Sequence, residues 1–243
     1  ACPLKWFFRY VAGLSEETVS SSLVFGGAIH QAVELHFREL MAGNEAPDLD
    51  MMLAEYHDAW RERELDAVEF GKSEDINTLS QLAERVLLVF QGSEFGQPTG
   101  RIVDVEEELR GQIADDCPDL LARIDLLIEG DDALSVIDLK TARSRWSQQR
   151  AEDSGEQLLL YSELAKELVP GKPLRLEFLV VTKAKSPVVE SHSVAVDPAR
   201  VERTKRVVEK TWKAMQAGYV YPSPSAMNCG GCPFRRPCQV WCG

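Results

Sequence analysis

Two aspartates and a lysine in the middle of the chain have the spacing of a cation-binding site. They occur in "LLARIDLLIEGDDALSVIDLKTA", residues 120–142. If Asp131–Asp132 is the two-residue loop of a β-hairpin, Asp125 lies directly opposite Asp138 on the neighbouring strand. Carboxylates that face each other destabilise a sheet unless they share a proton or a cation. Side chains alternate along a strand, so Lys140 lies on the same face as Asp138.

The residues around these charges favour a metal ion over a solvated hairpin. The flanking "LLI" and "LSVI" are typical of strands that are buried on both faces. Charges inside such strands are costly unless they are paired or bind a metal. A hard divalent cation such as Mg²⁺ or Mn²⁺, bound through oxygen ligands, fits this environment. The alternative is an exposed hairpin with scattered charges, which remains open for either aspartate alone.

Three helical residues are candidates to join this site. His30 follows Gly26–Gly27, a pair that lets its helix approach another backbone closely. Gln157 and Tyr161 are four residues apart and therefore share one face of a helix. A lone histidine on a helix is also compatible with a purely structural role.

The cysteines form a second candidate site. The segment "CGGCPFRRPC" holds Cys229, Cys232 and Cys238, and a tetrahedral thiolate site needs a fourth sulfur. Cys2, near the start of the chain, and Cys242, close to the other three, are both available. If Cys242 is the fourth ligand, the site is a local knuckle that suits zinc.

The order of the expected elements indicates an α/β fold. The apolar period is helical before Gly100, and alternating or continuous apolar strands follow. The order is three helices, a three-strand meander, a helix, two strands, a last helix and an irregular tail. The expected ranges are helices 25–43, 50–70 and 77–91, strands 101–113, 120–128 and 134–142, helix 156–168, strands 174–182 and 188–196, helix 198–218 and tail 219–243.

Composition sets the expected class of protein and its location. The chain has 243 residues, 44% of them hydrophobic, which suits one large domain. It has no apolar run of membrane-spanning length and no recognisable signal peptide, and CxxC spacing with six cysteines favours metal binding in a reducing, cytoplasmic setting.

The charge is unevenly distributed. The net charge is −12, which by itself argues against nucleic acid as a partner. Residues 200–243, however, carry eight bases and two acids, a net charge of +6. Four of these bases share one face of the last expected helix, which is either a solvated face or a track for a DNA backbone: Arg203, Arg206, Lys210 and Lys213.

Taken in order, these motifs resemble a known family. Gly-Gly-x-x-His at 26–30, the Asp of "ARID", the Asp-x-Lys of "VIDLKTA" and the Gln-x-x-x-Tyr of "EQLLLY" are similar to the RecB-type branch of the PD-(D/E)XK nuclease superfamily. That branch includes the AddB nuclease domain and CRISPR-associated exonucleases. The opening "CPLKWFFRYVAGL" and the closing C-x2-C-x5-C resemble the segments that carry the family's iron–sulfur ligands.

The resemblance implies a fold and cofactors. It implies a single nuclease domain over 1–243 with a restriction-endonuclease-like core, in which a central mixed sheet is flanked by helices. Residues 36–100 would be a helical insertion or lid, and 219–243 a cysteine-rich tail joined to the N-terminal segment through a 4Fe–4S cluster. The cluster ligands would be Cys2, Cys229, Cys232 and Cys238.

The resemblance also assigns roles to the candidate site residues. The ligands of Mg²⁺ or Mn²⁺ would be His30, Asp125, Asp138 and the Leu139 carbonyl. Lys140 would activate water and stabilise phosphate charge, and Gln157 and Tyr161 would position the substrate or this lysine.

The expected function is therefore a DNA nuclease, with an exonuclease on single strands or DNA ends favoured, in DNA repair, recombination or CRISPR spacer acquisition. Expected partners are DNA and a helicase or CRISPR integrase, with no membrane. The alternatives are a non-cleaving DNA-end-binding module of a helicase or integrase complex, and a zinc-stapled scaffold.

Overall fold

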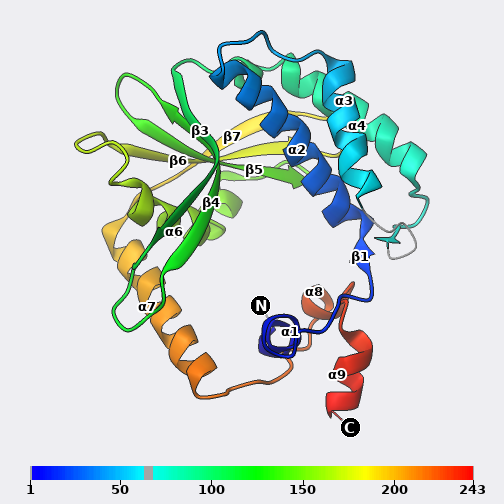
Figure 1. The fold of residues 1–243 in the computed structure, drawn as a ribbon, viewed down its shortest axis with the longest axis vertical. Coiled ribbons are helices and arrows are strands. Elements are labelled where there is room, and N and C mark those ends of the chain that lie inside the picture. Colours follow the sequence, from blue (N-terminus) through cyan, green and yellow to red (C-terminus); the bar gives the residue numbers. More distant parts are fainter. Residues whose placement is uncertain (1, 63–67, 243) are drawn as a thin grey trace.

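The structure is a computed structural model that describes residues 2–62 and 68–242 (Figure 1). Its centre is a five-stranded mixed sheet, as the sequence predicts. The strands are β3 (Arg101–Gly111), β4 (Leu120–Glu129), β5 (Leu134–Ala142), β6 (Leu174–Thr182) and β7 (Val189–Val194), in the order β3-β4-β5-β6-β7. The β5–β6 pair is parallel and the other pairs are antiparallel.

The hairpin of β4 and β5 has the predicted loop and register. The Gly130 N–H donates to the Ala133 carbonyl at 2.9 Å, so two residues form the turn. The paired residues run from Glu129–Leu134 to Leu126–Ile137. The described pairing ends there, one position before Asp125 and Asp138.

Helices cover both faces of the sheet. On one face α2 (Ser21–Met41), α3 (Leu49–Arg61) and α4 (Ile76–Gln91) share a buried cluster with strand residues such as Leu126 and Leu139. On the other face α6 (Glu156–Ala165) packs on residues such as Ile124 and Phe178. These are called the α2 side and the α6 side below. Also on the α6 side lie α5 (Gln148–Asp153) and α7 (Pro198–Gln216), whose buried residues Ala151 and Val201 belong to the same cluster.

Local capping explains where the helix boundaries differ from prediction. Helix α2 begins before residue 25 because the Ser20 hydroxyl accepts a hydrogen bond from the Leu23 N–H at 3.3 Å. Helix α4 begins at Ile76, one residue before the expected start, because Asp75 caps it through a capping box with Thr78.

The predicted helix 50–70 is too long. Helix α3 ends at Arg61, and β2 (Val68–Glu69) pairs in parallel with β1 (Val19–Ser20). Residues 63–67 of that prediction lie outside the described residues. Strand pairing with a distant segment therefore overrides the helical propensity at 68–69.

The tail is more ordered than the sequence predicts. It contains α8 (Ala226–Cys229), which Ser225 caps, and α9 (Arg235–Cys242), where proline is tolerated because it lies in the first turn. Both lie beside α1 (Pro3–Trp6), and the π-helix η1 (Phe7–Val11) follows α1 (Figure 1). Leu4, Phe8 and Phe234 form a small buried cluster between the two ends of the chain.

Two further short elements were not predicted. They are α5, capped by Ser147, and the 3₁₀ helix η3 (Glu94–Gly96). Among the described helices, none has the length and apolar character that crossing a membrane requires.

Helix α2 approaches the sheet most closely at Gly26. A Cβ at Gly26 would lie 3.0 Å from Thr141 Oγ1 of β5, whereas a Cβ at Gly27 would meet nothing within 4 Å. The predicted close approach therefore belongs to Gly26. This contact brings α2, with His30 one turn further along, against β5.

The two glycines give a matched test of this packing. Gly27→Ala should raise the free energy of unfolding by about 0.5–1 kcal/mol, because alanine stabilises a helix interior. Gly26→Ala should lose that gain, because its methyl group crowds Thr141. Urea denaturation of both variants measures the difference, and an equal gain in both would contradict the close approach.

Candidate active site

A change in strand alternation places Asp125 on the α2 side of the sheet. In β4, Ile124 and Leu127 pack on the α6 side, whereas Leu126 and Ile128 pack on the α2 side. Asp125 lines a pocket together with Leu126 and His30. Two consecutive β4 residues, 125 and 126, therefore face α2, which is what breaks the regular pairing with β5 at this point.

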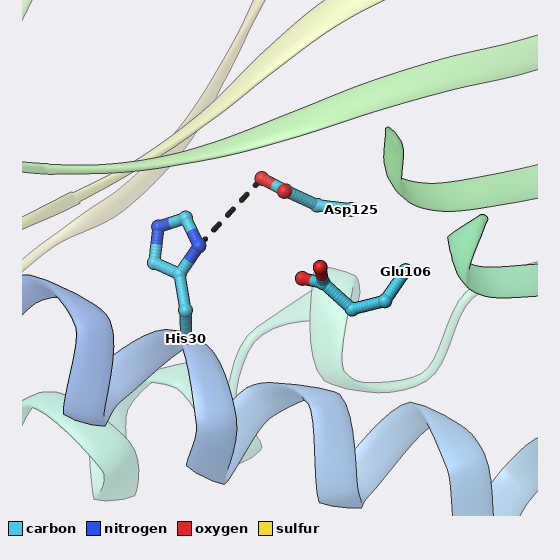
Figure 2. A group of neighbouring side chains, drawn as sticks. All are labelled: His30, Glu106 and Asp125. Carbon is cyan, nitrogen blue, oxygen red and sulfur yellow. Dashed lines mark ion pairs between the residues drawn. The ribbon is translucent and has the colours of Figure 1, made fainter. Parts of the chain in front are cut away.

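The Asp125 carboxylate takes over a backbone donor that the ladder leaves unpaired. Its Oδ2 accepts a hydrogen bond from the Leu139 N–H at 2.6 Å. The same oxygen lies 3.7 Å from Nδ1 of His30, which α2 directs toward it (Figure 2). Asp125, His30 and the backbone of Leu139 are thus brought together from three elements.

Asp138 and Lys140 lie on the α6 side, so the prediction that Asp125 and Asp138 face each other on one side of the sheet is wrong. Val136 and Ala142 of β5 pack there, and alternation places Asp138 and Lys140 with them. Lys140 Nζ contacts Asp138 Oδ2 in an ion pair, and the Asp138 side chain is 3% exposed.

Of the two predicted helical partners, Gln157 contacts Lys140 and Tyr161 contacts Gln157. Lys140 Nζ donates to Gln157 Oε1 at 3.5 Å, and Gln157 Nε2 donates to the Tyr161 hydroxyl at 2.5 Å. Lys140 Nζ also lies 5.8 Å from the centre of the Phe178 ring. The structure therefore brings the predicted residues into one chain of contacts, from Tyr161 to Asp138.

Burial dominates the ionisation of the two aspartates. It raises the pKa of Asp125 to about 7, with a further rise from the charge of Asp138 and an opposing effect of the Leu139 N–H. Burial also raises the pKa of Asp138, against the lowering effect of Lys140. Burial disfavours the ionised form of both carboxyl groups, and the negative charge of Asp138 adds to this effect on Asp125. A nearby positive charge would therefore stabilise both carboxylates.

The state of His30 suits ligation. Burial and the nearby charge of Lys140 lower its pKa to about 4, against a hydrogen bond to the backbone of Leu139 that raises it. The imidazole is therefore neutral near pH 7, the form that binds metals. With carboxylate and carbonyl oxygens beside it, this donor set fits Mg²⁺ or Mn²⁺.

Glu106 of β3 is a site residue that the sequence reasoning missed. Its carboxylate, His30 and Asp125 each offer a ligand atom within 4.8 Å of the others (Figure 2). Asp138 is outside this group and is paired with Lys140 instead. Glu106 is the first of three consecutive glutamates in "VEEEL". Nothing in this sequence distinguishes it from the two glutamates that follow.

Four cysteines from the two ends of the chain line one pocket. Cys2, Cys229, Cys232 and Cys238 line one pocket together with Phe8 and Phe234. The Ser223 N–H lies 3.4 Å from Cys2 Sγ. Burial alone would raise the pKa of Cys2. Hydrogen bonds from the backbone of Ser223, Lys5 and Leu4 together lower it by more than burial raises it, so the net change in the pKa is downward.

Two cysteines remain apart from this pocket. The side chain of Cys242, needed for a local zinc knuckle, lies outside the described residues. Cys117 is partly buried in the loop between β3 and β4 and does not line the pocket.

The raised pKa of Asp125 gives a testable pH dependence for the metal-free protein. A carboxyl group whose pKa is about 7 when folded, above the ordinary aspartate value of 3.8, favours the folded state at low pH. That advantage is lost as the pH rises from about 4 through 7. We expect the thermal stability of the wild type in EDTA to fall, relative to Asp125→Asn, across this range. Parallel curves would contradict the burial of this carboxyl group.

Two solved structures align with most of this chain at low sequence identity. A crystal structure from Eubacterium rectale, of a protein named "Putative exonuclease", aligns with a TM-score of 0.48 and 16% identity over 93% of this chain and 91% of that one. The crystal structure of SSO0001 aligns with a TM-score of 0.36 and 14% identity, over 95% and 90% of the two chains. No curated protein matches the sequence.

A family model gives the assignment. The model of the PD-(D/E)XK nuclease superfamily matches residues 1–239, which is nearly the whole chain and includes every candidate site residue described above except Cys242. The sheet order, the paired aspartates and the lysine two residues after the second aspartate are all inside this match. The chain therefore belongs to the PD-(D/E)XK nuclease superfamily.

Proposed function

We propose that this protein is a Mg²⁺- or Mn²⁺-dependent deoxyribonuclease of the RecB-type branch, similar to the AddB nuclease domain. It hydrolyses phosphodiester bonds as an exonuclease on single-stranded DNA or DNA ends. The observation that carries the proposal is the position of Asp125 at the split between β4 and β5, against the segment of β5 that carries Asp138 and Lys140. Asp125 reaches the backbone of β5 at Leu139, between Asp138 and Lys140.

The residues of the site have separate tasks in this proposal. His30, Asp125, Asp138 and the Leu139 carbonyl hold the divalent cation. When bound, the cation polarises a phosphoryl oxygen and lowers the pKa of the attacking water. For Asp138 to bind, its ion pair with Lys140 must loosen, which frees the ammonium group to face the substrate.

Lys140 stabilises the negative charge that develops on the phosphate. Gln157, held by Tyr161, keeps the lysine in place through its amide oxygen. Because Lys140 is partly exposed at the edge of a buried pair, it is accessible to a phosphate without being free to swing away.

The last long helix supplies a surface for the DNA backbone. Four basic residues of α7 are exposed: Arg203, Arg206, Lys210 and Lys213. A basic track attracts phosphates through counterion release and is independent of sequence, which suits a nuclease that degrades DNA of any sequence. The net charge of −12 belongs largely to other parts of the chain.

We assign a 4Fe–4S cluster to the cysteine pocket, with a structural role. Its ligands would be Cys2, Cys229, Cys232 and Cys238, which are contributed by the two ends of the chain and line one pocket. A link between Cys2 and Cys229 closes a loop of nearly the whole chain, which restricts the unfolded state in simple theory. Thiolates are the ligands that such clusters use.

The cellular task we propose is end processing in DNA repair, recombination or CRISPR spacer acquisition, together with a helicase or an integrase. A non-cleaving DNA-end module of such a complex is the other reading. Divalent-metal-dependent degradation of labelled DNA separates the two.

Lys140→Ala should lower cleavage by about 100-fold or more, because it removes the positive group at the developing phosphate charge. Binding of the same DNA should persist. The assay uses single and double strands labelled at the 5′ or 3′ end, with Mn²⁺, and it also gives the polarity. Asp138→Ala should be inactive as well.

Lys172→Ala is a matched control, because Lys172 is also a partly exposed lysine in an ion pair, with Glu129, at the far end of the hairpin. It should cleave like the wild type. Full activity of Lys140→Ala would refute the assignment.

The cluster is tested by anaerobic purification and spectroscopy. The wild type should absorb near 400 nm and contain iron, and Cys2→Ser should lose both the colour and part of its thermal stability. Cys117→Ser, which changes a cysteine outside the pocket, should keep them. A colourless wild type that contains zinc would favour the zinc-stapled scaffold.

A further inference from the structure

Glu106 has a backbone conformation that residues with a side chain seldom adopt. Its φ is +59°, in the middle of β3. This left-handed region is unfavourable for L residues other than glycine because Cβ approaches the backbone carbonyl oxygen. Such an outlier within a strand persists only where the surroundings impose it.

The outlier decides which face of the sheet receives the Glu106 side chain. Val105 packs on the α2 side, so regular alternation would send Glu106 to the α6 side. Instead Glu106 lines the pocket of His30 and Asp125 on the α2 side. The next residue, Glu107, pairs with Ile124, which packs on the α6 side.

The same change occurs in both strands at the same level. Residues 105 and 106 of β3 face α2 together, as do residues 125 and 126 of β4. Val105 is paired with Leu126, and Glu107 with Ile124, so Glu106 and Asp125 are the two residues between those pairs. The two strands thus deliver two carboxylates to one point opposite His30 (Figure 2).

Arg123 forms only a weak ion pair with the Glu106 carboxylate. Arg123 Nε lies 3.7 Å from Glu106 Oε2, but the arginine side chain is 64% exposed and makes a closer contact, 2.7 Å, with Glu108. On the pocket side Glu106 is surrounded by further negative groups, since Glu34 and Asp125 line the same pocket. A cation placed there would be favoured by all three carboxylates.

We propose that Glu106 is a further oxygen ligand of the divalent cation, which it binds together with Asp125 and His30. The inference rests on the proposed function, which places a divalent cation at this site. Ligand atoms of Glu106, His30 and Asp125 lie within 4.8 Å of one another. That spacing is close to the width of one coordination sphere, because ligands on opposite sides of Mg²⁺ are about 4.2 Å apart.

A role as a ligand explains why Glu106 has an unfavourable backbone conformation. A residue that served only the stability of β3 would be better as glycine, or would follow the regular alternation. Glu106 instead keeps a charged side chain in the left-handed region, where it reaches the pocket. The left-handed conformation destabilises β3 locally, but it adds a carboxylate to the proposed cation site.

The test is calorimetric titration of the full-length, divalent-free protein with MnCl₂. Glu106→Gln should weaken Mn²⁺ binding by about tenfold or more, because it replaces a carboxylate ligand by an amide of the same shape. Glu108→Gln should bind Mn²⁺ like the wild type; it removes the other carboxylate partner of Arg123, so it controls for the lost ion pair.

A second variant keeps the test independent of folding. Glu106→Gly relieves the left-handed backbone and should melt no lower than the wild type in EDTA, yet it should lose most of the rise in melting temperature that MnCl₂ gives the wild type. Unchanged Mn²⁺ affinity in Glu106→Gln, with a wild type that binds Mn²⁺ and cleaves DNA, would overturn this inference alone. A wild type that binds no Mn²⁺ would overturn the proposed function as well.

Discussion

The hydrogen bond from the Leu139 N–H to the Asp125 carboxylate is the contact on which the site depends. At 2.6 Å it replaces the backbone pairing that β4 and β5 give up after Leu126 and Ile137. Without it, an amide would be left unpaired beside a buried carboxylate, and each would be costly. The contact also fixes Asp125 over the segment that carries Asp138 and Lys140. Its position therefore sets the distance between the two halves of the site.

The sheet divides the site into two parts with different chemistry. On the α2 side, His30, Glu106 and Asp125 lie close enough together to hold a cation. On the α6 side, Asp138 and Gln157 hold the Lys140 ammonium group, and in the proposed function Asp138 would turn from this ion pair to the cation. The Leu139 backbone lies between them. A phosphate bound at this edge would meet a cation from one side and an ammonium from the other, which is the arrangement that phosphodiester hydrolysis requires.

Much of this arrangement could be predicted because it follows from local rules. The two-residue turn fixes the hairpin register, alternation places Lys140 with Asp138, and four-residue spacing places Gln157 beneath Tyr161. The close approach of α2 could be anticipated from the glycine pair, although only Gly26 makes it. The α/β class follows from the order of the elements, and the family resemblance implied the mixed sheet with helices on both faces.

What could not be predicted depends on contacts between distant segments or on broken local rules. Glu106 reaches the site because its φ is positive. A glutamate in a strand gives no sign of this conformation in the sequence, because positive φ is expected mainly for glycine. The short pairing of β1 with β2 and the helices of the tail are set by partners far away in the sequence. In the same way, alternation alone would place Asp125 and Asp138 on one face, and it is the irregularity at 125 and 126 that separates them.

The most direct measurement is anomalous diffraction from a crystal soaked in Mn²⁺. The account predicts a manganese peak at the split between β4 and β5, within bonding distance of carboxylate oxygens of Asp125 and Asp138 and beside His30. A soaked crystal in which these two aspartates bind no manganese, or in which the peak lies elsewhere on the molecule, would contradict it.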